Sequence, residues 1–507
     1  MIGYRRRFRD HGVEGRMELP ADSMNGRRQW IDLGVLLLAA LVLRAATLGD
    51  PNIHVDETFY LQVGDAMTRG AVPYIDVWDR KPLGIFLIYW AIASISTNVL
   101  FYQLVSLCFA VATAWVLGRI ARLWAGANAA LMAGISYLAM LNVLDGMGGQ
   151  SPVFYNLLMA QAAWLLISRW NGSDAAAFRR GHLMAMALCG LCLTIKQTTL
   201  FEGVFFGLAG LFWLWRRGQG AGQILRHGLT AIALAVIPTA LIAGWYAGHG
   251  WWAEWYQAMV TSNLRRQGIG DAALKHNIWA LIRLLGVFAG VALVGLAGAR
   301  GQSRFVPLRG FMLGWLLVSV LALAAVPNFF SHYALPILVP LTPLAALGFD
   351  RKGLGLAFFA MNLVVAVILG TAFDFKTHRA SARAFEEMAT TITRHRGNGS
   401  VLILNGPPLL YTLTGSKPMS PLVFPEHLIN ELETDVSPIR TKPEIERMIA
   451  ARPTVVVVPK NYVLRPTDGR IEVIEGYLAH SCRQVWQGVF WEPRAIPRGE
   501  IIYACAG

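Results

Sequence analysis

The chain has 507 residues, of which 55% are hydrophobic and only 15% charged, and its formal net charge is +14. A soluble globular protein has about 25% charged residues, so the composition excludes an ordinary soluble enzyme. Apolar runs of about 20 residues recur, which is the length that crosses about 30 Å of hydrocarbon. The sequence therefore predicts a polytopic α-helical membrane protein. Its positive charge does not indicate nucleic-acid binding, because membrane orientation itself requires positive loops on one side.

The chain begins with a basic segment, residues 1–30, that has no apolar core of its own. A cleavable signal peptide requires a short apolar region followed by a cleavage site of small residues. The first apolar run, residues 31–49, is longer than such a region and has no clear site of that kind. We therefore expect a cytoplasmic basic tail followed by a retained transmembrane helix.

Eleven apolar runs are predicted to be transmembrane helices. They lie near residues 31–49, 98–118, 127–146, 152–169, 182–195, 202–215, 229–248, 276–298, 310–326, 333–349 and 353–373. Residues 31–375 are thus expected to form one transmembrane domain. A further apolar run, residues 82–96, is interpreted as a membrane-embedded or interfacial helix of the first outer loop, residues 50–97.

Positive charge is concentrated in the loops on one side of this predicted bundle. Loops on the side of the N-terminus contain Arg119, Arg122, Arg169, Arg179, Arg180, Arg216, Arg217, Arg226, Arg300, Arg304, Arg309, Arg351 and Lys352. The opposite loops contain Arg69, Arg80, Lys81, Lys196, Arg265, Arg266 and Lys275. Because cytoplasmic loops carry the excess of Lys and Arg, the N-terminus is expected in the cytoplasm. If residues 82–96 crossed the membrane, every later loop would change sides and the positive loops would lie outside. The charge distribution therefore favours a membrane-embedded or interfacial helix at 82–96.

The composition changes after residue 375, where charged residues return. Short β-rich runs suit buried strands, and helical spacing appears between them. Helices are expected at 379–394 and 443–451, and strands at 401–404, 454–458, 483–491 and 500–504. Residues 376–507 are therefore predicted to form a small outward-facing, periplasmic α/β domain. No Gly-rich phosphate loop opens either strand–helix unit, so no cofactor is assigned to this domain.

Cys482 and Cys505 are the two cysteines that lie outside the apolar runs. The predicted topology puts both in an oxidising compartment, where disulfides persist. Each belongs to a predicted strand of the same small domain, and neighbouring strands bring Cα atoms within bonding distance. We therefore predict a disulfide between them, with two buried free thiols as the alternative.

A polar, acidic stretch, residues 54–82, separates long apolar regions near the start of the chain. Its first part, residues 55–69, has an apolar residue at every fourth position, which predicts an amphipathic helix in the plane of the interface. Asp56 and Glu57 stand at the beginning of this helix. Two roles for Asp56 remain open at this point: an N-cap of the helix, or a catalytic carboxylate beside a phosphate-binding cation.

Several ionisable residues at the predicted outer face have structural alternatives of the same kind. Lys81 could extend to the lipid headgroups, Lys196 could be an interfacial anchor, and Asp145 could be a polar helix end. His332 and Tyr333 could belong to an aromatic belt. Together, however, they place ionisable groups on several helices of one membrane face, and such groups within a bundle indicate function by default.

Three motifs of the first loop carry a family resemblance. They are DE-x2-Y (Asp56, Glu57, Tyr60), G-x2-PY-x-D (Gly70, Pro73, Tyr74, Asp76) and KP (Lys81, Pro82). This arrangement resembles the first outer loop of the GT-C glycosyltransferases, above all the protein O-mannosyltransferases and the aminoarabinose transferases that modify lipid A. Weaker similarity extends to residues 194–196 and 332–341, and the whole resemblance spans roughly residues 31–350.

The resemblance implies a reaction and a set of site residues. This family transfers a sugar from a polyprenyl phosphate, with inversion, to an acceptor hydroxyl at the outer membrane face. The matched acid, Asp56, would be the general base, and Glu57 would orient the acceptor or support Asp56. The donor phosphate would be bound by Lys81, then by Arg265, Arg266 and Lys196. Supporting residues would be Tyr60, Tyr74, Asp76, Asp79, Asp145, His332 and Tyr333.

The sequence departs from the aminoarabinose transferases at the residue before the Lys-Pro pair. Those enzymes tend to have Glu there, whereas this chain has Arg80, preceded by Asp79. The departure weakens the inference of the same sugar and of a metal bound at that position. No cofactor is certain; a divalent metal remains open, with His332 and Asp145 as candidate ligands.

The resulting hypothesis is an inner-membrane glycosyltransferase of the GT-C type, with a transmembrane domain and a C-terminal α/β domain. Its partners would be a polyprenyl-phosphate-linked sugar donor, membrane lipids and an envelope acceptor, which is a glycolipid, a lipopolysaccharide or a protein. The alternatives are a lipid-linked sugar transporter or flippase, and a non-catalytic scaffold for envelope synthesis. A transporter more often has internal repeats or matching broken helices, and the sequence has neither.

Overall fold

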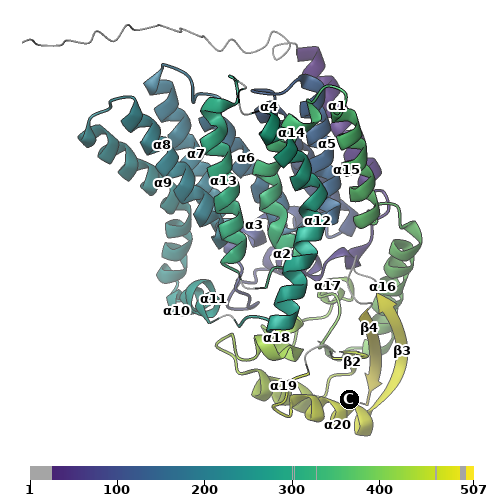
Figure 1. Cartoon of the computed structure of the whole chain (residues 1–507). Helices are drawn as coiled ribbons and strands as arrows, with labels where there is room; N and C mark the ends of the chain where they lie inside the picture. Colours follow the sequence, from purple (N-terminus) through teal and green to yellow (C-terminus); the bar gives the residue numbers. More distant parts are fainter. Residues whose placement is uncertain are drawn as a thin grey trace, which may run out of the picture.

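The computed structural model describes residues 26–265, 267–299, 301, 303–326, 328–462, 465–490 and 498–506. These residues form a bundle of long helices and, at one end of it, a smaller domain built on a four-stranded sheet (Figure 1). The short helices α2, α10 and α11 lie at the end of the bundle that faces the sheet domain. That boundary is where the polar stretch of residues 54–82 is found.

Each of the eleven apolar ranges overlaps one helix of the bundle. These helices are α1 (Gly26–Arg44), α4 (Val99–Ala121), α5 (Ala127–Val143), α6 (Ser151–Ile167), α7 (Ala175–Ile195), α8 (Leu200–Arg216), α9 (Ala221–Gly248), α12 (Asp271–Gly298), α13 (Val306–Ala324), α14 (Leu338–Phe349) and α15 (Gly355–Leu369). Helices α1, α7, α9 and α12 begin five or more residues before the predicted ranges, because hydropathy detects only the apolar part of a helix whose first turns are polar. The chain is a multi-pass membrane protein, and six of its described segments are long and apolar enough to cross a bilayer.

The helix predicted not to span is short. Helix α3 (Leu83–Ala93) has 11 residues, and at about 1.5 Å per residue it is roughly 16 Å long, about half of the hydrocarbon thickness. It packs against α2 (Val55–Thr68). Connecting segments of the described chain are η2 (Pro51–Ile53), η3 (Gln197–Thr199), α10 (Trp252–Tyr256), η4 (Gln257–Thr261), α11 (Ser262–Leu264) and η5 (Ser331–Ile337).

Helix α2 differs from its prediction in one respect. An interfacial amphipathic helix buries one face, but every residue from Glu57 to Asp65 is buried here. The reason is that α2 lies between two partners: α3 packs on it from the bundle, and α17 (Leu409–Leu413) from the C-terminal domain (Figure 1). The helix is therefore an internal element at the junction of the two domains.

The C-terminal domain begins with α16 (Phe375–Arg396), capped by the Asp374 side chain, which accepts a hydrogen bond from the backbone N–H of Thr377. The strands have the order β1-β2-β4-β3, with β1 parallel to β2 and the other pairs antiparallel. They are β1 (Val401–Ile403), β2 (Val455–Pro459), β3 (Cys482–Phe490) and β4 (Arg498–Cys505). The remaining elements are α18 (Glu426–Ile429), η6 (Glu431–Glu433), α19 (Thr441–Ala450) and α20 (Arg470–Ser481). The predicted helices and strands of this domain are all present.

Trp78 of the first loop is part of the hydrophobic core of the C-terminal domain. Its side chain is 1% exposed and clusters with apolar residues such as Leu402, Leu428 and Ile445. Its backbone N–H donates to the carbonyl of Pro421 (2.9 Å), and its indole N–H donates to the Gln257 side chain (3.2 Å). A buried Trp contributes one of the largest apolar areas of any side chain, so the first loop is anchored firmly to this domain.

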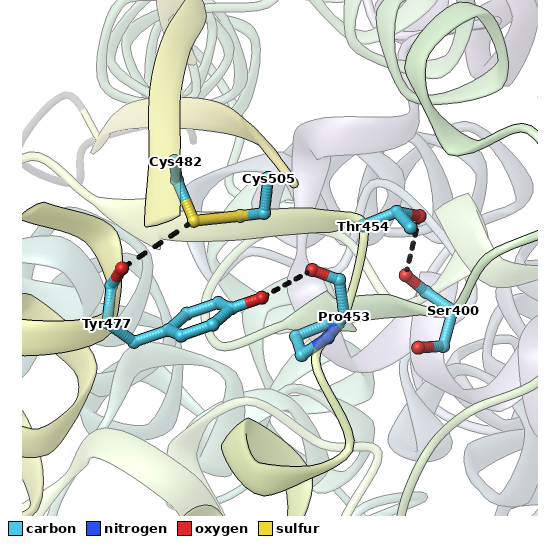
Figure 2. Close-up of a disulfide and its surroundings, with 6 residues drawn as sticks. All are labelled: Ser400, Pro453, Thr454, Tyr477, Cys482 and Cys505. Carbon is cyan, nitrogen blue, oxygen red and sulfur yellow. Dashed lines mark hydrogen bonds between the residues drawn. A yellow bond between two sulfur atoms is a disulfide. The ribbon is translucent and has the colours of Figure 1, made fainter. Parts of the chain in front are cut away.

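Cys482 and Cys505 face each other across β3 and β4 and form a disulfide (Figure 2). Two hydrogen bonds lie near the disulfide in the same view. The Tyr477 hydroxyl donates to the carbonyl of Pro453 (3.0 Å), and the Thr454 hydroxyl donates to the carbonyl of Ser400 (3.2 Å). The disulfide thus joins the last strand to the strand that follows α20.

The disulfide leads to a direct chemical test. Thiol labelling of the denatured, unreduced protein is expected to modify three cysteines, Cys108, Cys189 and Cys192, and reduction should raise the number to five. Replacing both Cys482 and Cys505 with Ser should lower the free energy of unfolding of the domain by roughly 3 kcal/mol, because the unfolded chain gains loop entropy. Five reactive thiols before reduction would contradict the bridge.

Candidate active site

Asp56 lies in the first turn of α2, and its position is set by the residue that begins the helix. The N-cap is His54, whose Nδ1 accepts a hydrogen bond from the backbone N–H of Asp56 (3.2 Å). The N-cap alternative for Asp56 is therefore wrong. With the cap supplied by His54, the Asp56 carboxylate is directed to side chains outside its own helix.

The ammonium of Lys81 lies between two carboxylates. Its Nζ is 3.3 Å from Asp56 Oδ1 and 3.2 Å from Asp79 Oδ2. Asp79 is only 1% exposed, and its Oδ1 also accepts a hydrogen bond from the backbone N–H of Lys81 (2.8 Å). The rings of Phe59, Tyr60 and Phe424 surround the ammonium at 4.6–5.4 Å, close enough for cation–π attraction.

This arrangement determines the ionisation states of Asp56, Asp79 and Lys81 at neutral pH. Burial alone would raise the pKa of Asp56 and Asp79. The Lys81 ammonium, together with His54 and His332 at Asp56 and with His427 at Asp79, outweighs burial and holds both pKa values well below their usual range. Burial likewise favours the neutral amine of Lys81, but the two carboxylates raise its pKa above the ordinary value. All three groups are ionised, and together they sum to one net negative charge.

The C-terminal domain supplies further charges to the same loop. His427 Nε2 is 3.5 Å from Asp79 Oδ2, and His427 Nδ1 is 3.6 Å from Glu433 Oε2; at these lengths the contacts are electrostatic rather than good hydrogen bonds. Burial lowers the pKa of His427, but these two carboxylates raise it above its ordinary value. Arg80 forms an ion pair with Glu433, so the arginine that precedes the Lys-Pro pair is neutralised by a residue from the other domain.

The turn before Lys81 is held by Tyr74 and Asp76. The Tyr74 hydroxyl donates to the carbonyl of Lys81 (2.8 Å), and Asp76 Oδ2 accepts from the backbone N–H of Val72 (2.7 Å). Tyr74 has φ +71°, a conformation that costs a bulky residue on the order of 1–3 kcal/mol and that is found where surrounding structure enforces it. Both predicted supporting residues thus act on the backbone of the loop.

Glu57 is separated from its neighbour Asp56. It is completely buried and lies against Gly148, where a larger residue would collide with its carboxylate. Burial raises its pKa to about 7, although His54, the backbone N–H of Gly149 and the Tyr102 hydroxyl act in the opposite direction. Because successive helical residues point about 100° apart, Glu57 faces the core of the bundle. The expectation that it orients the acceptor beside Asp56 is not supported by this placement.

A segment from late in the chain completes the site. The His332 ring meets the His54 ring edge-on, with 4.8 Å between ring centroids. Lys196, at the end of α7, has its Nζ 5.1 Å from the centre of the Tyr333 ring. Asp145 accepts a hydrogen bond from the Ser331 hydroxyl, so it contacts the residue before His332 rather than the carboxylate cluster. Metal-ligating atoms of His54, Asp56 and His332 all lie within 4.8 Å of one another, whereas Asp145 is not part of this group.

The structure does not place the two arginines that were predicted to bind the donor phosphate, Arg265 and Arg266, beside Asp56 or Lys81. Arg266 lies outside the described residues. Arg265 is exposed at the end of α11, and no contact with Asp56 or Lys81 is seen in the described part of the chain. Its neighbour Asn263 donates to the carbonyl of Arg80 (3.4 Å), so this segment does reach the first loop.

Four residues of the site were missed by sequence reasoning: His54, Phe424, His427 and Glu433. His54 directly precedes the Asp-Glu pair, and a His at a helix start beside an acid could have been noticed. The other three come from the C-terminal domain, 353 positions away in the case of the Arg80–Glu433 pair. No motif links such distant positions in a single sequence.

Comparison with solved structures identifies the fold. A crystal structure of ArnT from Cupriavidus metallidurans bound to undecaprenyl phosphate is similar over 93% of this chain and 98% of that chain, with a TM-score of 0.61 and 13% identity. The apo state of the same protein gives a TM-score of 0.59 at 13% identity, over 93% and 97% of the two chains. The arabinofuranosyltransferase AftD from Mycobacteria is similar over 95% of this chain and 42% of that chain, with a TM-score of 0.51 and 15% identity.

No protein-family model matches the sequence, and no curated protein matches it either. The structural similarity nevertheless extends through both domains. The chain therefore has the fold of the GT-C glycosyltransferases, and the resemblance that the first-loop motifs indicated is confirmed at the level of the fold.

The buried carboxyl of Glu57 predicts a pH-dependent stability. Its pKa in the folded state, about 7, lies above the ordinary value of 4.5, so the folded chain holds this proton more tightly than the unfolded chain does. The stabilisation is complete below pH 4.5 and is lost as the pH rises to about 7, and the gap corresponds to about 3 kcal/mol. Glu57→Gln, which is neutral at every pH, should therefore be more stable than the wild type above pH 7.

Thermal unfolding of both proteins in detergent, measured across this pH range, checks the expectation. The difference between variant and wild type should be small at low pH and should widen as the pH rises. Parallel pH profiles for the two proteins would show that Glu57 has an ordinary pKa.

Proposed function

We infer that this chain is a membrane glycosyltransferase that moves a sugar from a polyprenyl-phosphate carrier to an acceptor hydroxyl, with inversion. The observation that carries the inference is the Lys81 ammonium held between Asp56 and Asp79 in the first loop of a GT-C fold. A cation for the phosphate and a carboxylate for the acceptor proton lie within 3.3 Å of each other. The undecaprenyl phosphate bound to the similar structure from C. metallidurans supports this class of donor.

The reaction needs few groups. As the acceptor oxygen attacks the anomeric carbon, Asp56 takes its proton, and the bond between that carbon and the phosphate oxygen breaks. The electron pair leaves with the polyprenyl phosphate, whose added negative charge Lys81 stabilises. A phosphate is already a good leaving group, so no separate general acid is required. Attack from the face opposite the phosphate inverts the anomeric centre.

Lys81 also couples donor binding to the strength of the base. While the ammonium contacts Asp56, it holds the pKa of that carboxyl low, which keeps the carboxylate ionised but makes it a weak base. A donor phosphate that attracts Lys81 removes part of this stabilisation, and the basicity of Asp56 then increases. The site is thus most reactive when the donor is present.

The proposed location follows the charge distribution of the loops. With the N-terminus in the cytoplasm, the first loop and the C-terminal domain face the periplasmic side of the inner membrane. The donor lipid lies in the bilayer, and the acceptor is an envelope glycolipid, lipopolysaccharide or protein. The burial of Trp78 in the core of the C-terminal domain and the contact of His427 with Asp79 support a role of that domain in positioning Lys81.

Asp56→Asn is expected to abolish transfer of a labelled sugar from polyprenyl phosphate to an envelope extract in proteoliposomes. Asn preserves the size and polarity of the side chain but cannot accept the proton, and general-base catalysis contributes about 10²–10⁴-fold. Asp174→Asn is a matched control, because Asp174 caps α7 and Asn caps equally well. Transfer by Asp56→Asn at a rate near that of the wild type would contradict the base assignment and favour a transporter or a scaffold.

Lys81→Ala is expected to weaken binding of the donor more than binding of the acceptor. A charge-assisted hydrogen bond contributes roughly 1.5–3 kcal/mol, so the KM for the donor should rise about 10- to 150-fold. Lys81→Arg keeps the charge between the two carboxylates and should recover part of the loss, and the exposed Lys460→Ala serves as a control. Unchanged donor kinetics in a folded Lys81→Ala protein would remove Lys81 from the phosphate site.

A further inference from the structure

A basic pocket lies between membrane helices at the end of the bundle opposite the C-terminal domain (Figure 1). It has a volume of about 470 Å³ and is formed by the first turns of α7, the end of α8 and the first turns of α9. Three arginines, Arg179, Arg180 and Arg226, line it together with Gln219 and Gln223. Membrane orientation requires positive charge on one side, but it does not require arginines of two helices to share one pocket.

The pocket is separate from the active site. Helix α7 ends at Ile195, next to Lys196, whose ammonium contacts the Tyr333 ring. The 21 residues of α7 span roughly 30 Å at about 1.5 Å per residue. Arg179, in the second turn, therefore lies on the order of 25 Å from that end of the helix. A phosphate that contacts Lys81 does not reach this pocket.

The positive charge of the pocket is not compensated by the protein. None of the lining residues is acidic, and none of the three arginines has an ion-pair partner within the described ranges. Asp174 acts electrostatically on Arg179 and Arg180, but its Oδ1 already accepts hydrogen bonds from the backbone N–H groups of Ala176 and Ala177 (2.9 Å each). Guanidinium groups around one cavity repel one another, and an anion in the cavity relieves this repulsion.

Uncharged groups of the same pocket also suit an anion. Helix α9 begins after Gly220, which has no side chain to cap it, so the first backbone N–H groups and the positive end of the helix dipole are available to a phosphate. Arg179 Nη1 donates to the Gln219 side chain (2.9 Å), which holds both groups at the pocket. His227 lines the wall and is only 8% exposed. Its Nε2 lies 2.9 Å from His182 Nδ1, and this contact fixes the orientation of the ring.

An apolar stripe continues from the pocket along the outside of α9. Leu225, Leu229 and Ile232 are 65%, 60% and 59% exposed, and their spacing of four and three residues puts them on one face of the helix. The stripe begins beside Arg226 and runs into the membrane-crossing part of α9. Trp215, at the end of α8, is 63% exposed, and an exposed Trp is typical of the headgroup level of a bilayer. A ligand in the pocket is thus next to the lipid-facing surface.

We propose that the pocket binds the phosphate headgroup of an anionic membrane lipid, whose acyl chains lie along the apolar stripe of α9. Basic pockets between transmembrane helices bind anionic lipid headgroups, and the planar guanidinium group matches the geometry of phosphate oxygens. The bound lipid joins the start of α7 to the start of α9, two helices that pack against each other. Lipid binding goes beyond the proposed transferase function and does not depend on it.

Native mass spectrometry of the full, delipidated chain in a neutral detergent tests the proposal. Phosphatidylglycerol should bind about 10-fold or more tightly than phosphatidylcholine with the same acyl chains, because the latter has no net charge. Arg179→Gln combined with Arg226→Gln should weaken phosphatidylglycerol binding about 10-fold or more, since charge-assisted hydrogen bonds are lost. The control is Arg304→Gln combined with Arg309→Gln, which removes the same charge from exposed positions at the start of α13, outside the pocket. This control should bind phosphatidylglycerol as the wild type does.

Equal affinity of the wild type for the two lipids would overturn the proposal, as would equal loss of binding in the pocket and control variants or no loss in either. Inorganic phosphate should bind far more weakly than phosphatidylglycerol, and phosphate binding of equal strength would assign the pocket to a soluble phosphate compound instead of a lipid. Thermal unfolding identifies a double variant that has lost its fold. Because Arg226 is exposed, Arg226→Gln alone then provides the measurement, with an expected loss of affinity of roughly threefold or more.

Discussion

The position of the Lys81 ammonium between Asp56 and Asp79 is the interaction on which the site depends. A buried cation is stable only when its charge is compensated. Here two carboxylates share one ammonium, so one of them would remain available to the proposed reaction. Asp79 is almost fully buried and is itself in contact with His427, so it stays with Lys81. Asp56 lies at the start of a helix whose cap is supplied by His54, so its carboxylate is the one that can change partners. The asymmetry between two similar acids thus arises from their burial and from a helix cap.

The C-terminal domain contributes directly to the geometry of the site. Trp78 is buried in its core, and the next three residues, Asp79, Arg80 and Lys81, form the charged network of the site. A loop of this length between membrane helices would otherwise lose its geometry to conformational entropy. The strained backbone of Tyr74 and the hydrogen bond from its hydroxyl to Lys81 fix the same loop from the side of the bundle. Both domains therefore determine where one ammonium group lies.

The sequence predicted those features that depend on local pattern. Hydropathy located the helices because a membrane imposes a minimum apolar length. Charge asymmetry argued against a full span at residues 82–96, where the structure has a helix of 11 residues. The first-loop motif drew attention to Asp56 and Lys81, which the structure brings together. The motif did not indicate that Glu57 faces the core of the bundle and not the site, because adjacent residues of a motif point about 100° apart on a helix. His427 and Glu433 could not be found, because their contacts with Asp79 and Arg80 depend on the docking of two domains, which no short-range pattern encodes.

A structure of the chain with bound polyprenyl phosphate tests the central claim most directly, namely that the donor phosphate takes Lys81 from Asp56. Such a structure is expected to place a phosphate oxygen within hydrogen-bond distance of Lys81 Nζ, to keep Lys81 beside Asp79, and to lengthen the separation between Lys81 Nζ and Asp56 Oδ1 beyond the present 3.3 Å. A phosphate bound elsewhere, with the Lys81–Asp56 contact unchanged, would contradict the account.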